Sequence, residues 1–181
     1  SNSAYDAFTS DPYWRSGTEL ISGASVFGMT TRVTLQQVQA AGFTVSVIDF
    51  LRPMGDDLMF CGFDYTGSDA YHILRMKPDG SISPLVAPST LLPDGVGGTS
   101  TPWWFPDHLA TAPTSYAFDT SLAGSSQVLR LYASFNGGPV QHLQAEGDAI
   151  VTPSEPAGIG QFLDVLSLRF LDVGTLEVTA T

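Results

Sequence analysis

FTVSVIDFLRPMGDDLMFCGFDYTGSDAYHILRMKPDGSISPLV, residues 43–86, is the stretch that decides the fold. Short apolar runs with a period of two are separated there by the turn signals PMGDD, TGSD and PDG. A period of two is typical of β-strands, and short polar turns join strands that run antiparallel. We therefore predict four strands in an antiparallel meander, at 43–50, 57–65, 70–77 and 81–86.

A single short helix is predicted immediately before this meander, in TLQQVQAAG. Thr34 can cap its first turn, with Gln37 three residues later as the capping-box partner. Gly42 favours a stop after about two turns. We see no second segment with a good helical pattern.

Strand patterns return after residue 114. SYAFD and QVLRLYASF are followed by Asn136-Gly137-Gly138 and by PVQHLQA. A three-residue loop there places Leu131 opposite Leu143 and Tyr132 opposite His142. The chain ends in a further predicted hairpin, FLDVLSLRF, the bend LDVG and TLEVTAT.

A faint internal repeat relates 64–85 to 119–143, each with an Asp-led turn, a strand containing Leu-Arg, a Gly turn and a returning strand. These segments resemble hairpins of a β-propeller blade. Blades of about 40 to 45 residues would give roughly four in this chain, fewer than most propellers use. We therefore predict an all-β, mainly antiparallel fold, a single sandwich or barrel-like domain over 20–181.

Two aromatic segments lie outside the strand pattern. Residues 1–19 show neither a helical nor a strand period, and we predict that they form an extended N-terminal arm. Residues 86–114 are rich in Pro, Gly, Ser and Thr, which predicts a long loop, and loops of this length usually make contacts or carry function. The large aromatic residues of the two segments are Tyr5, Phe8, Tyr13, Trp14, Trp103, Trp104 and Phe105.

The charge balance excludes some partners. The 181-residue chain has 18 acidic and 7 basic residues and a formal net charge of -11. Such a surface repels phosphate backbones and anionic membranes, so neither a nucleic acid nor a membrane is expected as a partner. No apolar run approaches the roughly 20 residues of a membrane span, and the first residues lack a signal-peptide pattern.

The candidate chemical groups form no catalytic or metal-binding motif. Cys61 lies between phenylalanines, where we expect a buried, inert thiol. His72, His108 and His142 are far apart in the sequence, although Asp107-His108 directly follows the aromatic cluster. Asp64, Thr66, Ser68 and Asp69 favour a plain turn over a calcium loop. The adjacent acids Asp56 and Asp57 favour a solvated turn over a glycosidase pair. We expect no enzyme activity, no cofactor and no metal.

These observations favour a non-enzymatic structural or interaction subunit of a larger assembly. The aromatic residues of the arm and of the WWF segment are the expected contacts, with protein subunits of the same assembly as partners, in a homo-oligomer. In composition and layout the chain resembles the small β subunits of virions, such as capsid decoration or tail proteins of tailed phages, which implies a virion or extracellular location. The alternative is a carbohydrate-binding module in which Trp103, Trp104 and Asp107 hold a sugar.

Overall fold

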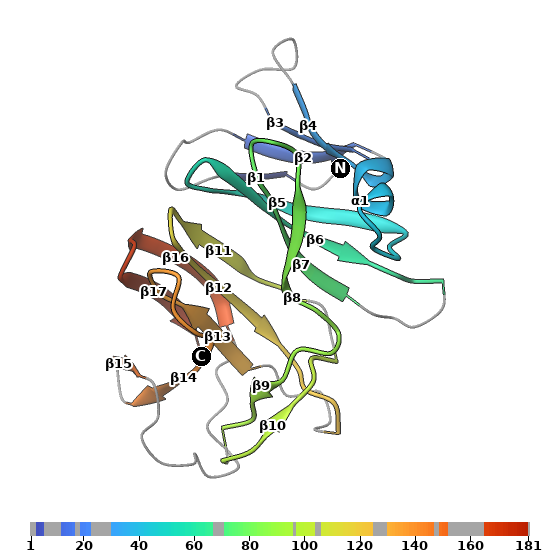
Figure 1. Ribbon diagram of the computed structural model, residues 1–181. Coiled ribbons are helices and arrows are strands. Elements are labelled where there is room, and N and C mark those ends of the chain that lie inside the picture. The colour runs from blue at the N-terminus through green and yellow to red at the C-terminus, as the bar shows by residue number, and fades with distance from the viewer. Residues whose placement is uncertain are drawn as a thin grey trace. The chain divides into compact units, whose positions relative to one another are not determined.

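The computed structural model describes residues 3–5, 12–16, 19–22, 30–66, 71–95, 97–103, 106–124, 130–146, 149–151 and 165–180. In these ranges the chain forms antiparallel strands and one short helix, so the predicted all-β fold class is confirmed (Figure 1). The chain divides into two compact units, Ser1–Ala87 and Pro88–Thr181. The single domain over 20–181 stays a prediction. The one helix of the described residues is too short to cross a membrane.

The first unit holds two four-stranded sheets, and in each the strands pair in chain order. The second sheet is the predicted four-stranded meander, although its first strand lies at 47–54 and not at 43–50, and extends into the turn predicted at 53–57. The strands of the first sheet are β1 (Ser3–Tyr5), β2 (Pro12–Ser16), β3 (Glu19–Ser22) and β4 (Thr30–Thr34). Those of the second are β5 (Val47–Met54), β6 (Asp57–Phe63), β7 (Tyr71–Met76) and β8 (Ile82–Val86).

A β-bulge in β5 sets which side chains of that strand enter the core. Asp49 pairs with Cys61 and Arg52 with Met59, so β5 carries one extra residue between these pairs. Phe50 adopts a φ of 60° there, and its N–H donates to Asp49 Oδ1 at 2.8 Å. The extra residue brings Ile48 and Leu51 to the same hydrophobic cluster, although an odd spacing would separate them in a regular strand.

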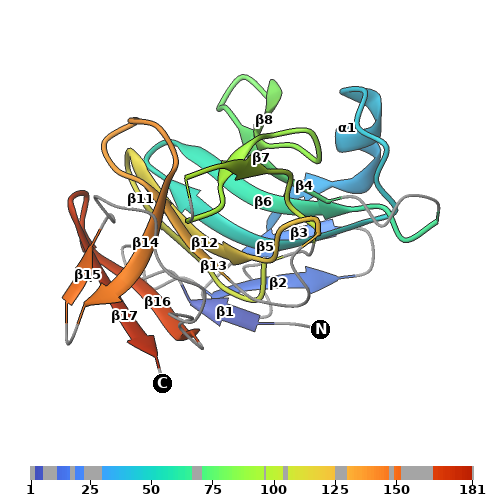
Figure 2. The ribbon, with the colours of Figure 1, turned by 90° about the horizontal axis from the view of Figure 1, so that it is seen from below.

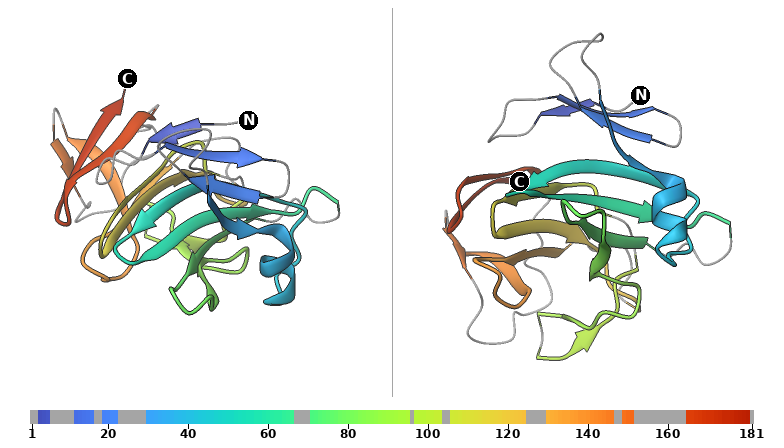
Figure 3. Two further views of the ribbon diagram at one scale, coloured as in Figure 1. Left: turned by 90° about the horizontal axis from the view of Figure 1, so that it is seen from above. Right: turned by 45° about the horizontal axis from the view of Figure 1, so that its top comes forward.

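Helix α1 (Leu35–Ala40) follows β4 (Figure 3), and its Val38 is buried in this core. Its capping box is the predicted one, because the Gln37 N–H donates to Thr34 Oγ1 and the Thr34 N–H donates to Gln37 Oε1. Gly42, at a φ of 94°, follows the last turn. The buried members of the cluster come from the helix, the segments beside it and the sheet: Val33, Val38, Val45, Ile48, Leu51, Leu58, Phe60 and Leu74.

The second unit is built on a five-stranded antiparallel sheet, again in chain order (Figure 2). Leu131 pairs with Leu143 and Tyr132 with His142, so the predicted register is confirmed. The sheet comprises β11 (Leu109–Ala112), β12 (Ser115–Thr120), β13 (Arg130–Ser134), β14 (Gln141–Glu146) and β15 (Ala149–Val151). Two smaller pairs are β9 (Leu92–Pro93) with β10 (Thr99–Ser100), and β16 (Val165–Asp172) with β17 (Thr175–Ala180).

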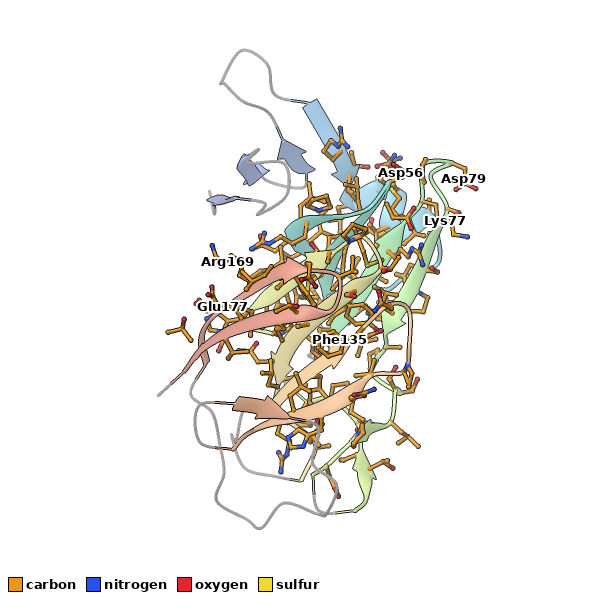
Figure 4. The ribbon with its side chains drawn as sticks, turned by 90° about the vertical axis from the view of Figure 1, so that its left-hand side faces the viewer. Asp56, Lys77, Asp79, Phe135, Arg169 and Glu177 are labelled. Atoms are coloured by element: carbon orange, nitrogen blue, oxygen red, sulfur yellow. The ribbon has the colours of Figure 1, made fainter. Side chains whose placement is uncertain are left out.

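The two faces of this sheet carry different side chains. One face is apolar and mostly small, and Phe170 of the β16–β17 hairpin packs against its Ala117, Leu131 and Ala133. The other carries an aromatic row across three strands, in which the ring of Tyr132 lies 5.4 Å from that of Phe118 and 5.6 Å from that of His142. On the β16–β17 hairpin itself, Arg169 and Glu177 form an exposed ion pair (Figure 4).

The faint repeat in the sequence corresponds to a shared topology. β5 to β8 and β11 to β14 are both antiparallel meanders in chain order. The repeated segments 64–85 and 119–143 contain β7 with β8 and β13 with the start of β14. The repeat therefore marks the second half of each meander.

Strands also occur in both segments that were predicted to lack them. β1 and β2 lie within 1–19; their backbone is extended, as predicted, but they pair with each other and β2 pairs with β3. β11 and the short pair β9–β10 lie within 86–114, so the loop prediction was wrong at these positions. Pro106 and Pro113 lie on either side of the four residues of β11. Because proline is typical of turns, the sequence indicates a turn-rich segment there and not a strand.

We predict that Thr34→Ala lowers the free energy of unfolding by about 1 kcal/mol, because the Gln37 N–H loses its capping acceptor. Urea denaturation measures the change. Thr44→Ala, at an exposed position outside the helix, serves as the control and should change stability by less than about 0.5 kcal/mol. Equal effects of the two substitutions would contradict the capping role.

We predict that Cys61 reacts slowly with a thiol reagent in the native protein and rapidly in denaturant. The side chain is fully buried in β6, as the sequence predicts, so labelling requires opening of the strand. Reaction with a chromogenic disulfide reagent measures both rates. Equal rates in the two conditions would show that the thiol is accessible in the folded state.

Candidate functional site

The chain departs from the antiparallel ladder along β12 after Pro102 and rejoins it at Leu109. Pro102 forms a bridge with Leu122, and Leu109 pairs with Phe118. Between these two pairs the chain advances seven residues from Pro102 to Leu109 but only four from Phe118 to Leu122. The first segment therefore carries three extra residues. We call residues 103 and 106–108 the Trp103 bulge. Trp104 and Phe105 lie outside the described residues.

On the N-terminal side of the bulge, at Trp103, backbone hydrogen bonds fix the chain to the residues that follow β12. The Trp103 N–H donates to Ser121 O at 2.8 Å, and the Ala123 N–H donates to Thr101 O at 2.9 Å. The Ser100 hydroxyl adds a bond to Ala123 O at 3.0 Å. These bonds hold the backbone of Trp103 in place before the chain leaves the ladder.

The outgoing side is fixed by one buried carboxylate, that of Asp119 on β12. Its Oδ1 accepts the N–H groups of Asp107 and His108, each at 2.8 Å. Its Oδ2 lies 2.6 Å from His108 Nδ1, and an ionised carboxylate accepts a hydrogen bond from an imidazole N–H. Asp119 has no exposed surface, so these three donors replace the water that an ionised carboxylate requires.

The bulge also contains a second carboxylate, that of Asp107. Partial burial raises its pKa above the ordinary value, the charge of Asp119 raises it further, and His108 lowers it. Asp107 is an exposed residue, unlike Asp119. An exposed carboxylate and an imidazole with one fixed nitrogen are therefore adjacent at the end of the bulge.

Trp103 is 66% exposed. In contrast, Pro102 and Pro106 are buried. The interpretation of Trp103 as a core anchor is thereby excluded. The backbone on both sides is tied to 119–123, so the indole is presented to solvent from a fixed support. This arrangement can bind a flat apolar surface or stack on a ring, and it requires little ordering to do so.

The remaining predicted contact residues belong to the first unit. Tyr5 lies in β1, where it pairs with Pro12, and Tyr13 and Trp14 lie in β2. Phe8 lies outside the described residues. β1 and β2 pair within the first sheet of that unit, whereas the Trp103 bulge belongs to the second unit.

The acidic residues of the two predicted turns have different surroundings. Asp56 is exposed on the β5–β6 turn, at the same end of the meander as Lys77 and Asp79 (Figure 4). Asp57 is buried and forms an ion pair with Arg75, so the prediction that both acids solvate a turn was wrong for Asp57. Asp64 accepts the N–H and the hydroxyl of Thr66, as a plain turn requires, while Ser68 and Asp69 lie outside the described residues.

Metal-binding clusters are absent from the described part of the chain, where no three His, Cys, Asp or Glu side chains are grouped to hold an ion. His72 contacts the ring of Phe43 at 5.4 Å, and burial lowers its pKa. Within the described residues, His108 is the only one of the three histidines that pairs with a carboxylate.

Sequence reasoning missed Asp119, the residue on which the outgoing side of the bulge depends. A signal existed, because SYAFDTS places a carboxylate within a run that otherwise reads as a buried strand. A charge in such a position needs a partner. The identity of that partner, His108, follows only from the pairing of β11 with β12.

Comparison with protein-family models, with curated proteins and with solved structures found no match.

We predict that Asp119→Ala lowers the free energy of unfolding by about 3 kcal/mol or more, because three donors lose a buried acceptor. His108→Ala should cost less, since Asp119 keeps two backbone N–H partners. Urea denaturation of each variant measures these differences.

The control for this comparison is Asp56→Ala, which removes an exposed carboxylate and should change stability by less than about 0.5 kcal/mol. If Asp119→Ala is no more destabilising than Asp56→Ala, the buried carboxylate does not hold the bulge.

Proposed function

We propose that the protein is a non-enzymatic interaction subunit that associates with further copies of itself through the Trp103 bulge. The observation that carries the proposal is the exposed indole of Trp103 on a backbone that is hydrogen-bonded on both sides. The proposed partner is a second copy of the chain. We further propose that these copies assemble into a virion particle.

Energetics support a contact role for Trp103. Tryptophan is enriched among the residues that dominate binding energy, because its large ring buries much apolar surface. A flexible loop would lose entropy on binding, whereas a loop already fixed at 103 and 107–108 loses little. Leu91, which is also 66% exposed, provides further apolar surface in the same unit.

The net charge determines how such an assembly depends on salt. Copies that each carry a formal charge of -11 repel one another at low ionic strength. Salt shortens the Debye length from about 30 Å at 0.01 M to about 8 Å at 0.15 M, so it removes most of this repulsion. The apolar contact itself does not weaken, and self-association should therefore strengthen with salt over this range.

Carbohydrate binding is the second candidate, and one observation favours it. Trp103, Asp107 and His108 are fixed on neighbouring residues of one chain segment, 119–121. A stacking ring with an adjacent carboxylate and imidazole is the combination that binds the apolar face and the hydroxyls of a sugar.

We predict that Trp103→Ala weakens self-association at least about tenfold and leaves the far-ultraviolet spectrum unchanged, because the removed ring lies in solvent. Sedimentation velocity over a concentration series, at low and at moderate salt, measures the association. Tyr65→Ala removes another exposed aromatic ring, from the first unit, and should have little effect.

Three results would redirect the proposal. A wild-type protein that stays monomeric at high concentration and moderate salt would refute self-association. Equal weakening by Trp103→Ala and Tyr65→Ala would remove the bulge from the interface. Binding on a glycan array that Trp103→Ala abolishes would establish the carbohydrate candidate instead.

A further inference from the structure

A second feature of the same unit is the segment at 92–100, which contains β9 and β10 and lies over the end of the aromatic row at His142. Residue 96 is outside the described part of this segment. The row itself is formed by Phe118, Tyr132 and His142 on three adjacent strands. The segment is held on it by two kinds of contact, one between backbone and ring and one formed by hydrogen bonds.

The ring contact is between Gly95 and His142. A Cβ atom placed on Gly95 would lie 2.7 Å from His142 Cε1 and 2.9 Å from His142 Nδ1. The backbone at Gly95 therefore covers the edge of the imidazole that carries Nδ1. Glycine is required there for two reasons, since its φ of 78° is also unfavourable for other residues.

Hydrogen bonds fix the neighbouring residues. The Tyr132 hydroxyl donates to Pro93 O at 2.7 Å, and Arg130 Nε donates to Asp94 O at 3.1 Å. The turn is closed on itself, because the Asp94 N–H donates to Gly98 O at 3.0 Å and the Gly98 N–H donates to Asp94 Oδ1 at 2.8 Å. The first two bonds hold the turn on the sheet and the other two close the turn, so we expect the turn to open when the first two are lost.

His142 is held in a state that suits only the neutral imidazole. Its side chain is buried, and its Nδ1 has no hydrogen-bond partner. Protonation would place an N–H at this atom, beneath Gly95, without an acceptor. An N–H at this position needs a new acceptor, and Gly95 covers it in the closed form, so we expect the segment at 92–100 to move away on protonation.

The surroundings of His142 also favour its neutral form, because together they lower its pKa. Burial lowers the pKa of His142 below its ordinary value of 6.5, Arg130 on β13 lowers it further, and Asp94 after β9 raises it. Tyr132 stays neutral, since burial raises its pKa. A base whose pKa is lower in the closed form takes up a proton on opening. The closed form is therefore favoured above pH 6.5 and is weakened as the pH falls below it.

We propose that His142 is a pH-sensitive latch, whose protonation releases the segment at 92–100 and uncovers the aromatic row of Phe118, Tyr132 and His142. The latch is independent of any role of Trp103 in association. It opens one side of the sheet and leaves the hydrogen-bonded ladder of β12 with β13 intact.

Hydrogen exchange tests the latch. We expect the protection of the Asp94 and Gly98 amides, corrected for intrinsic exchange, to fall at least about fivefold between about pH 7.5 and about pH 5, because a buried donor without a partner destabilises the closed form. Amides of β12 should keep their protection, which separates release of the segment from global unfolding. In His142→Phe, whose ring does not titrate, the fall should disappear.

A matched control and a second variant complete the test. His72 is the other histidine with a buried, unpartnered Nδ1 among the described residues, and it lies in the first unit, so His72→Phe should leave the fall unchanged. Gly95→Ala should abolish the protection already at about pH 7.5, since its methyl group meets the imidazole. An unchanged protection in the wild type, or an equal fall in His142→Phe, would overturn the proposal.

Discussion

The burial of carboxyl groups in the central strands is the constraint on which both meanders depend. β6 and β12 are buried at every residue, so neither strand has a solvent face. Each nevertheless carries an aspartate, Asp57 in β6 and Asp119 in β12. An isolated charge in such a strand would cost several kcal/mol, and each carboxylate is therefore held by a basic partner, Arg75 in one unit and His108 in the other.

In the second unit the same constraint also shapes the surface. A strand that departs from its ladder leaves N–H groups without acceptors, and Asp119 Oδ1 supplies the acceptor for two of them. The buried charge and the extruded segment therefore stabilise each other: the carboxylate needs the donors, and the bulge needs the acceptor. Trp103 is exposed as a consequence, because the backbone on both sides is fixed while the extra residues have no place in the ladder.

The elements that could be predicted are those whose signals are local. The meander at 47–86, the capping box of Thr34 and Gln37, and the pairing of Leu131 with Leu143 follow from periodicity, cap residues and turn length. β11 was missed because four strand residues between prolines give too short a pattern. The bulge of β5 was missed because Phe50 is not a residue type that favours a positive φ, so only the structure reveals that Ile48 and Leu51 share one core.

The sequence by itself determined the fold class, the helix that follows Thr34, most of the described strands and the acidic surface, because each depends on residues close together in the chain or on composition. The tertiary structure decided which polar groups meet. His108 and Asp119 are eleven residues apart, and Gly95 and His142 are forty-seven apart, so no periodicity relates them. Their contacts arise when the ladder along β12 and the turn over β14 form, and the chemistry of the site depends on those long-range contacts.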